Sequence, residues 1–197
     1  MTTTTRTNLL AEAEQLIRRC GYSAFSYADL TNKIGITKAS IHYHFPTKQG
    51  LMEAVVAQAM MRFSTALSLI EQEDTDSLKR LAAYSQLFLD GFDDRLRPFC
   101  CALSSEVVVL PEPIQKRTQE YFDIHIDWLT GVVAAGLGCG ELRWDGTAQE
   151  LAQLILSTLE GGSLVARAQK NQDLLFAGFQ QVMRLISPEA PASAESP

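Results

Sequence analysis

The sequence lacks most of what membrane, secreted and zinc-binding proteins contain. No apolar run reaches the roughly 18 residues that a membrane-spanning helix needs. The opening residues, MTTTTRTNLLAEAEQ, become amphipathic and acidic where a signal peptide would be apolar. The four cysteines show no CxxC spacing and no nearby histidine cluster, which argues against a structural zinc site. We therefore expect a cytoplasmic protein with thiol cysteines, no membrane partner, no metal and no cofactor.

Motifs of catalysis are also absent. No Ser/His/Asp set occurs in a motif context, and no glycine-rich loop is suited to hold a phosphate. The stretch GLGCGE, residues 136–141, has glycines at the wrong spacing and no strand before it. We predict that the chain is not an enzyme.

The charge is distributed unevenly along the chain. The 197 residues have a net charge of −6, yet residues 1–50 hold six basic and three acidic side chains, a local balance of +3. The remaining residues carry a balance of −9. A basic end on an acidic body favours a nucleic-acid-facing N-terminal region.

Helical patterns fill the first 50 residues. A helix ends at Gly21, and a short second helix follows Ser26, a suitable N-cap. Gly35 then gives a tight turn, and a third helix begins at Thr37 and stops before Pro46. Two short helices joined through a glycine turn are typical of a helix-turn-helix.

The rest of the chain is predicted to be helical too, because β-branched alternation is scarce. We therefore predict an all-α fold of about nine helices, ending in a disordered Pro/Ala/Ser-rich tail over residues 188–197. The six further helices are predicted from Thr47 through Phe63 and over Ser77–Phe92, Leu103–Leu110, Ile114–Ala135, Thr147–Ala168 and Leu174–Ile186.

The third helix has one apolar face and a polar remainder. Ile41 and Phe45 are four residues apart and would face the core. The polar remainder suits duplex DNA, because Lys, Ser, His and Tyr side chains bind phosphates and base edges. On this helix alone, a solvated polar face with no ligand is an equally good interpretation. The polar residues are Lys38, Ser40, His42, Tyr43 and His44.

The segment YADLTNKIGITKASIHYHFPTKQGL resembles the DNA-binding domain of TetR-type transcriptional regulators. Three positions depart from the usual pattern: Ala39 replaces Gly, His42 replaces Tyr and Gly50 replaces Glu. Matching positions are Ser26, Leu30, Ile34, Gly35, Ile36, Thr37, Lys38, Ser40, Ile41, His44, Phe45, Lys48 and Leu51. The DNA contacts that we predict are Ser26, Tyr27, Thr37, Lys38, Ala39, Ser40, His42, Tyr43, His44 and Lys48.

The resemblance implies a ligand-responsive repressor. Residues 1–50 would be the DNA-binding domain, and residues 51–187 a helical domain for ligand binding and dimerisation. It implies a homodimer, joined through the last two helices, on a palindromic operator of double-stranded DNA, released by a small-molecule effector. The alternative for the last two helices, and for half of the aromatic residues, is ordinary core packing. The predicted effector contacts are Phe63, Phe88, Phe92, Cys100, Cys101, Phe122, His125 and Trp128.

The adjacent cysteines leave a second function open. The run RPFCCALSSEVVVLPEP is similar to a helix start in a subgroup of these regulators, some of which sense electrophiles or oxidants through cysteine. Nearby Arg95 and Arg97, or a helix N-terminus, would favour the reactive thiolate of Cys100 or Cys101. The alternative is that both thiols are small buried apolar groups.

Overall fold

The fold is all-α, as the sequence predicts. The computed structural model describes residues 2–90, 92 and 94–188, so the predicted tail lies outside the described residues from residue 189 onward. In this described part every regular element is a helix. None of these helices is both long and apolar enough to cross a membrane. The α-helices are α1 (Thr2–Cys20), α2 (Tyr27–Ile34), α3 (Lys38–His44), α4 (Lys48–Glu73), α5 (Ser77–Gln86), α6 (Phe99–Ser104), α7 (Glu112–Cys139), α8 (Ala148–Gln169) and α9 (Asp173–Ile186).

Several predicted helix boundaries differ from the structure. The helix predicted over Ser77–Phe92 is α5, which ends at Gln86 and is followed by a short 3-10 helix, Leu87–Leu89. The helix predicted from Thr47 through Phe63 continues to Glu73. The helix predicted over Leu103–Leu110 is instead α6 followed by a short 3-10 helix, Val107–Val109. Pro98 precedes α6 at the N-cap position, where its missing N–H costs no helical hydrogen bond. At the other end, α7 continues to Cys139 through Gly136, whose missing side chain admits Leu142 at a distance where a Cβ atom would clash.

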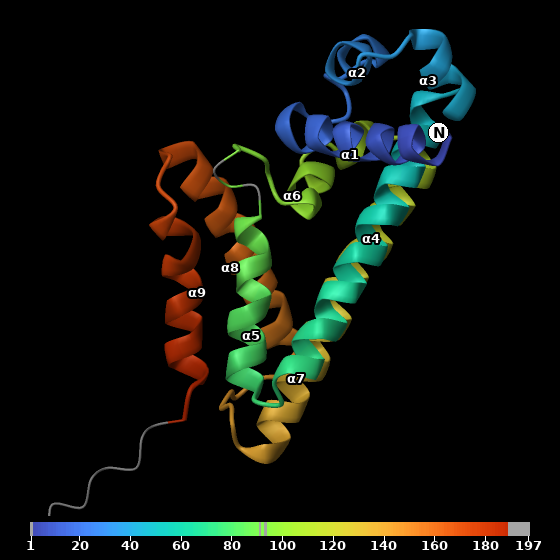
Figure 1. The fold of residues 1–197 in the computed structure, drawn as a ribbon. Coiled ribbons are helices and arrows are strands. Elements are labelled where there is room, and N and C mark those ends of the chain that lie inside the picture. Colours follow the sequence, from blue (N-terminus) through green and yellow to red (C-terminus); the bar gives the residue numbers. More distant parts are fainter. Residues whose placement is uncertain (1, 91, 93, 189–197) are drawn as a thin grey trace, which may run out of the picture. The chain divides into compact units, whose positions relative to one another are not determined.

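The chain divides into two compact units. Unit 1 comprises Met1–Ser68 and Leu89–Ile124, and unit 2 comprises Leu69–Phe88 and His125–Pro197. In unit 1, α1 contacts both α2 and α6, and α2 contacts α3 (Figure 1). Leu9, Leu10, Ala13 and Ile17 recur at helical spacing on α1 and are buried. The core residues of this region include Leu9, Ala13, Ile17, Phe25, Leu30, Ile41 and Leu51.

A buried arginine fixes the C-terminal end of α1 within unit 1. The Arg18 side chain donates to the Asp90 carboxylate at 2.7 Å and, through Nε, to the Arg97 carbonyl at 2.7 Å. The Arg97 backbone N–H donates in return to the Arg18 carbonyl at 3.1 Å. Charged hydrogen bonds in a buried setting are among the stronger ones. The segment that leads into α6 is therefore bonded directly to α1.

In unit 2, α8 and α9 pack side by side. Gly162 permits the close approach, since a Cβ atom there would lie 2.7 Å from the Leu175 carbonyl oxygen. Thr147 caps α8 through a reciprocal capping box with Glu150. The residues buried between these helices and their neighbours include Leu151, Ile155, Leu159, Leu175, Phe179 and Val182.

Candidate functional site

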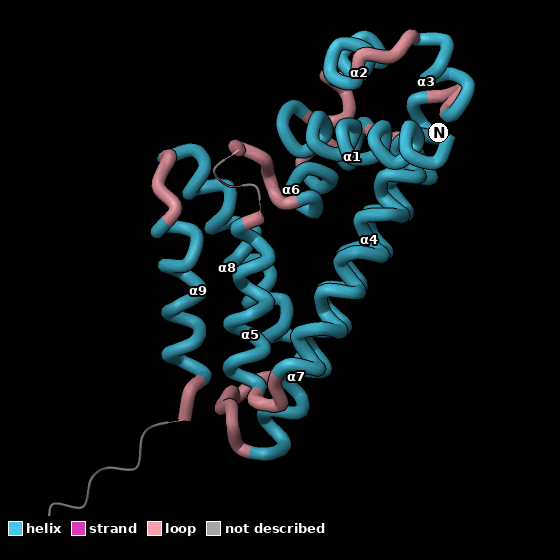
Figure 2. The backbone as a smooth tube through the Cα atoms, viewed as in Figure 1, coloured by secondary structure: helices cyan, strands magenta, loops and turns pink. Residues whose placement is uncertain are grey.

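Local capping positions α3. Gly35 adopts the left-handed conformation, with φ 74°, and its N–H donates to the Thr31 carbonyl at 2.9 Å, which ends α2. Thr37 then caps α3, because its hydroxyl oxygen accepts the Ser40 N–H at 3.2 Å. The short loops before and after α3 follow from these caps and from Pro46 (Figure 2).

The two faces of α3 differ as the sequence pattern indicates. Ile41 and Phe45 are buried in the core of unit 1. Tyr43 is 78% exposed, and Lys38, Ala39 and His42 are also exposed, while Ser40 and His44 are half-buried. Thr37 is exposed at the start of the helix. One face thus presents an ammonium, two imidazoles, hydroxyls and an aromatic ring to the surroundings, a set that can bind phosphates and base edges.

Tyr27 is the buried member of the predicted DNA contacts. Its hydroxyl donates to the Phe45 carbonyl at 2.8 Å, and burial raises the pKa of Tyr27. Its ring packs edge-on against the His42 ring, with centroids 5.0 Å apart. The Tyr27 side chain thus links α2 to the C-terminal end of α3 and packs against the His42 ring. A direct DNA contact by Tyr27 stays a prediction.

His42 is held from a second side. Its Nδ1 lies 3.2 Å from the Pro46 carbonyl oxygen. A carbonyl oxygen can only accept, so Nδ1 is the protonated nitrogen in this arrangement. The sequence had no signal for this bond, which depends on how the chain turns after α3.

Ser26 caps α2 together with Asp29. The Ser26 backbone N–H and hydroxyl both donate to Asp29 Oδ2, at 2.7 and 2.8 Å. These hydrogen bonds lower the pKa of the Asp29 carboxyl. The predicted phosphate contact at Ser26 stays a prediction, and it would require the Asp29 carboxylate to give up this position.

Lys48 opens α4 beside the loop that follows α1. Its Nζ lies 4.5 Å from the ring centroids of both Tyr22 and Phe25, a cation–π arrangement. Burial lowers the pKa of Lys48, while the negative charge of Glu106 opposes that shift. Thr47 caps α4, since its hydroxyl accepts the Gly50 N–H at 3.0 Å. The ammonium therefore packs over two aromatic rings beside the N-terminus of α4, and the phosphate contact predicted for Lys48 stays a prediction.

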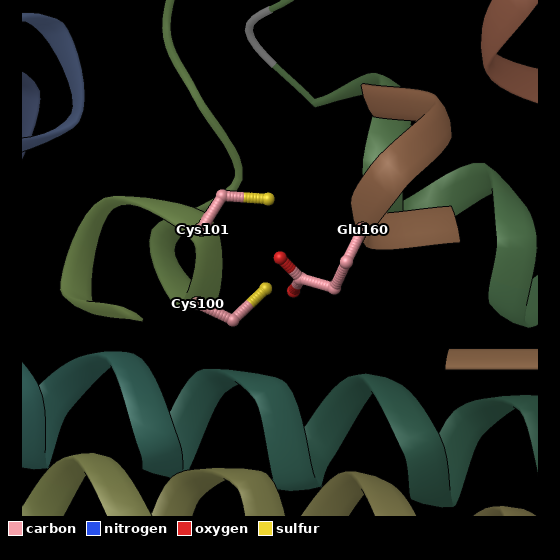
Figure 3. Close-up of side chains that lie close together, drawn as sticks. All are labelled: Cys100, Cys101 and Glu160. Carbon is pink, nitrogen blue, oxygen red and sulfur yellow. The ribbon is translucent and has the colours of Figure 1, made fainter. Parts of the chain in front are cut away.

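In unit 1, the predicted effector residues are spread over several elements. Phe63 packs edge-on against Tyr121 at 5.4 Å. Phe122 lines a surface groove of about 720 Å³ along α6 and α7, and Phe92 is half-buried in the turn before α6. The other two are Cys100 and Cys101, buried on α6 with both thiols on one side of the helix (Figure 3).

In unit 2, three predicted effector residues surround a tyrosine that the prediction did not include. The Tyr84 hydroxyl lies 2.6 Å from His125 Nδ1, and the Tyr84 ring stacks on Trp128 at 5.4 Å. Phe88 packs against both Tyr84 and His125. His125 is 1% exposed, and burial lowers the pKa of His125 to about 3. The i, i+4 spacing of Tyr84 and Phe88 was the signal that could have identified Tyr84.

The chain is similar to bacterial regulators of known family. The family pattern for the bacterial regulatory proteins of the tetR family matches residues 9–55. A TetR-family transcriptional regulator from Agrobacterium tumefaciens is 31% identical, with 95% of this chain and 100% of that one covered and a TM-score of 0.89. A TetR regulator from Legionella pneumophila is 29% identical, covering 91% and 96%, with a TM-score of 0.83.

The chain is also similar in sequence to a transcriptional regulator and to a nucleoid occlusion factor. The transcriptional regulator CymR of Pseudomonas putida is 26% identical over 174 residues, which are 86% of this chain and 82% of CymR. The nucleoid occlusion factor SlmA of Marinobacter nauticus is 28% identical over 119 residues. That match spans 60% of each chain, so it covers less than two thirds of SlmA.

Proposed function

The chain belongs to the TetR family of bacterial regulatory proteins and is a DNA-binding transcriptional regulator rather than an enzyme, and from this we propose that it is an effector-released repressor. It binds a palindromic operator as a homodimer, and a small molecule releases it. The observation that carries the proposal is the α3 surface, where polar and aromatic side chains are exposed above the buried Ile41 and Phe45. The regulator is proposed to act in the cytoplasm.

Recognition of DNA is assigned to the exposed face of α3 and to the helix starts beside it. An exposed α-helix fits the major groove, where base edges can be read. Lys38 and Tyr43 project from α3 for this purpose, and Lys48 lies at the start of α4. The acidic body, with its balance of −9 outside residues 1–50, disfavours non-specific DNA binding elsewhere on the surface.

Dimerisation is assigned to α8 and α9. Apolar side chains remain exposed on this pair although their other faces are buried, among them Leu164 at 51% and Leu185 at 62%. Gly161 on α8 has open space around it, which would let a second helix approach closely. A partner copy that covers these side chains would bury apolar area, and the same surface on both subunits would give a two-fold axis.

Release by an effector is assigned to a change that reaches α1 through α6. Effector contacts are proposed at the predicted aromatic residues, and the bonds of Arg18 with Asp90 and Arg97 tie the segment before α6 to α1. A molecule that displaces α6 would thereby move the DNA-binding residues 1–50 and weaken DNA binding.

The thiol switch is the weaker of the two candidate mechanisms. Cys100 is 3% exposed and Cys101 is 1% exposed, so a reagent has little access to either sulfur. Replacing both by serine is expected to leave DNA binding and its sensitivity to oxidants unchanged.

Selection of duplexes from a random DNA pool, repeated over a series of salt concentrations, tests the proposal. An enriched palindrome, with affinity that falls steeply in salt, is expected of a dimeric reader. Lys38→Ala and Tyr43→Ala should then weaken binding by about tenfold each, whereas Lys116→Ala, an exposed lysine on α7, should not. A protein that enriches no sequence and binds no duplex at low salt contradicts the proposal.

A further inference from the structure

A hydrogen bond determines which ring nitrogen of His42 carries the proton. Under the proposed function, His42 lies on the surface of α3 that faces a bound duplex. The Nδ1 atom donates to the Pro46 carbonyl oxygen at 3.2 Å. The Tyr27 ring packs against the imidazole at 63°, which restrains its rotation. In the neutral ring, the remaining nitrogen, Nε2, then carries a lone pair and no proton.

Nε2 is available to a partner. His42 is exposed on α3, and within the described chain its hydrogen bond runs through Nδ1 alone. An atom that can only accept is selective in the major groove. It can bond to the exocyclic amino group of adenine or cytosine, and it is repelled by the acceptor oxygens of guanine and thymine.

We propose that His42 is a specificity-determining residue, which in its neutral form accepts a hydrogen bond at Nε2 from an exocyclic amino group, adenine N6 or cytosine N4, in each operator half-site. This inference rests on the proposed function, because it needs an operator. It differs from a phosphate contact, since phosphate oxygens cannot donate to an unprotonated nitrogen.

The test begins with the operator selected by the wild-type protein. At each half-site position, an A·T pair is changed to G·C or a C·G pair to T·A, which replaces an amino donor by a carbonyl acceptor at the same edge of the groove. One position in each half-site should lose about tenfold in affinity.

His42→Phe retains a ring against Tyr27 and removes both nitrogens. It should reduce the discrimination at that position to about twofold or less while the other positions keep theirs. Tyr43→Phe, a matched aromatic change on the neighbouring residue, should leave this position unaffected.

Circular dichroism and thermal unfolding establish that the variants are folded. An operator at which His42→Phe keeps every base preference overturns the inference and leaves the proposed function standing. Failure of the wild-type protein to enrich any sequence removes the proposed function and this inference together.

Discussion

The buried imidazole of His125 predicts a specific loss of stability in acid. Burial lowers the pKa of His125 to about 3 in the folded state, whereas an unfolded histidine has a pKa of about 6.5. Between these two pH values the unfolded state binds more protons than the folded state. The free energy of unfolding therefore falls as the pH falls from about 6.5 towards 3.

The size of this loss follows from how far the pH lies below the pKa of the unfolded histidine. At about pH 5 the ring is protonated in the unfolded chain and neutral in the folded one, and this pH is about 1.5 units below the unfolded pKa. Each unit is worth about 1.4 kcal/mol, so the loss relative to neutral pH is about 2 kcal/mol. That is a large fraction of the stability of an ordinary domain.

Urea denaturation followed by circular dichroism at about pH 7 and pH 5, at one protomer concentration, measures this loss. His125→Asn cannot titrate but retains an amide that can bond to Tyr84, and it should remove about 2 kcal/mol of the acid-induced loss. An equal acid-induced loss in the wild type and in His125→Asn would refute the assignment of a neutral buried ring.

Three backbone predictions follow from positions where side-chain space or φ is restricted. Gly162→Ala should lower the free energy of unfolding by about 1–3 kcal/mol, because its Cβ would meet the Leu175 carbonyl. Gly131→Ala, in open space within α7, should instead raise the stability of that helix by up to about 1 kcal/mol. Lys170→Gly should raise stability by about 0.5–1 kcal/mol, since Lys170 has a left-handed φ of 53°. Gly21→Ala should lower it by about 1–3 kcal/mol, because φ is 91° there. Urea denaturation of each variant beside the wild type measures all four, and a change of opposite sign contradicts the corresponding argument.

The parts that could be predicted from the sequence are those determined by local chemistry. The turn at Gly35, the cap at Thr37 and the end of α3 before Pro46 depend on residues within a few positions of one another. The same is true of the buried and exposed faces of α3, which follow from a 3.6-residue period. These features sufficed to predict the all-α fold and the polar face of α3.

The parts that could not be predicted depend on contacts between distant residues. Tyr27 is one of the predicted DNA contacts, but its hydroxyl donates to the carbonyl of a residue 18 positions away and the side chain is buried. The start of α6 is determined by Pro98 and by the bonds of the preceding Arg97 to α1. Neither contact leaves a periodic trace in the sequence, because each is a single tertiary bond.

Contacts near the end of α1 connect α6 with the loop before α2 and with the start of α4. Glu106, just after α6, accepts the Ser23 N–H at 3.2 Å, and its carboxylate occupies the space beside Gly21 that any larger residue would need. Its negative charge also acts on Lys48, the residue proposed to contact phosphate at the start of α4. A shift of α6 would thus alter both the loop that precedes α2 and the electrostatic environment of that ammonium. Under the proposed function, this set of contacts is a route by which an effector that displaces α6 would act on residues 1–50.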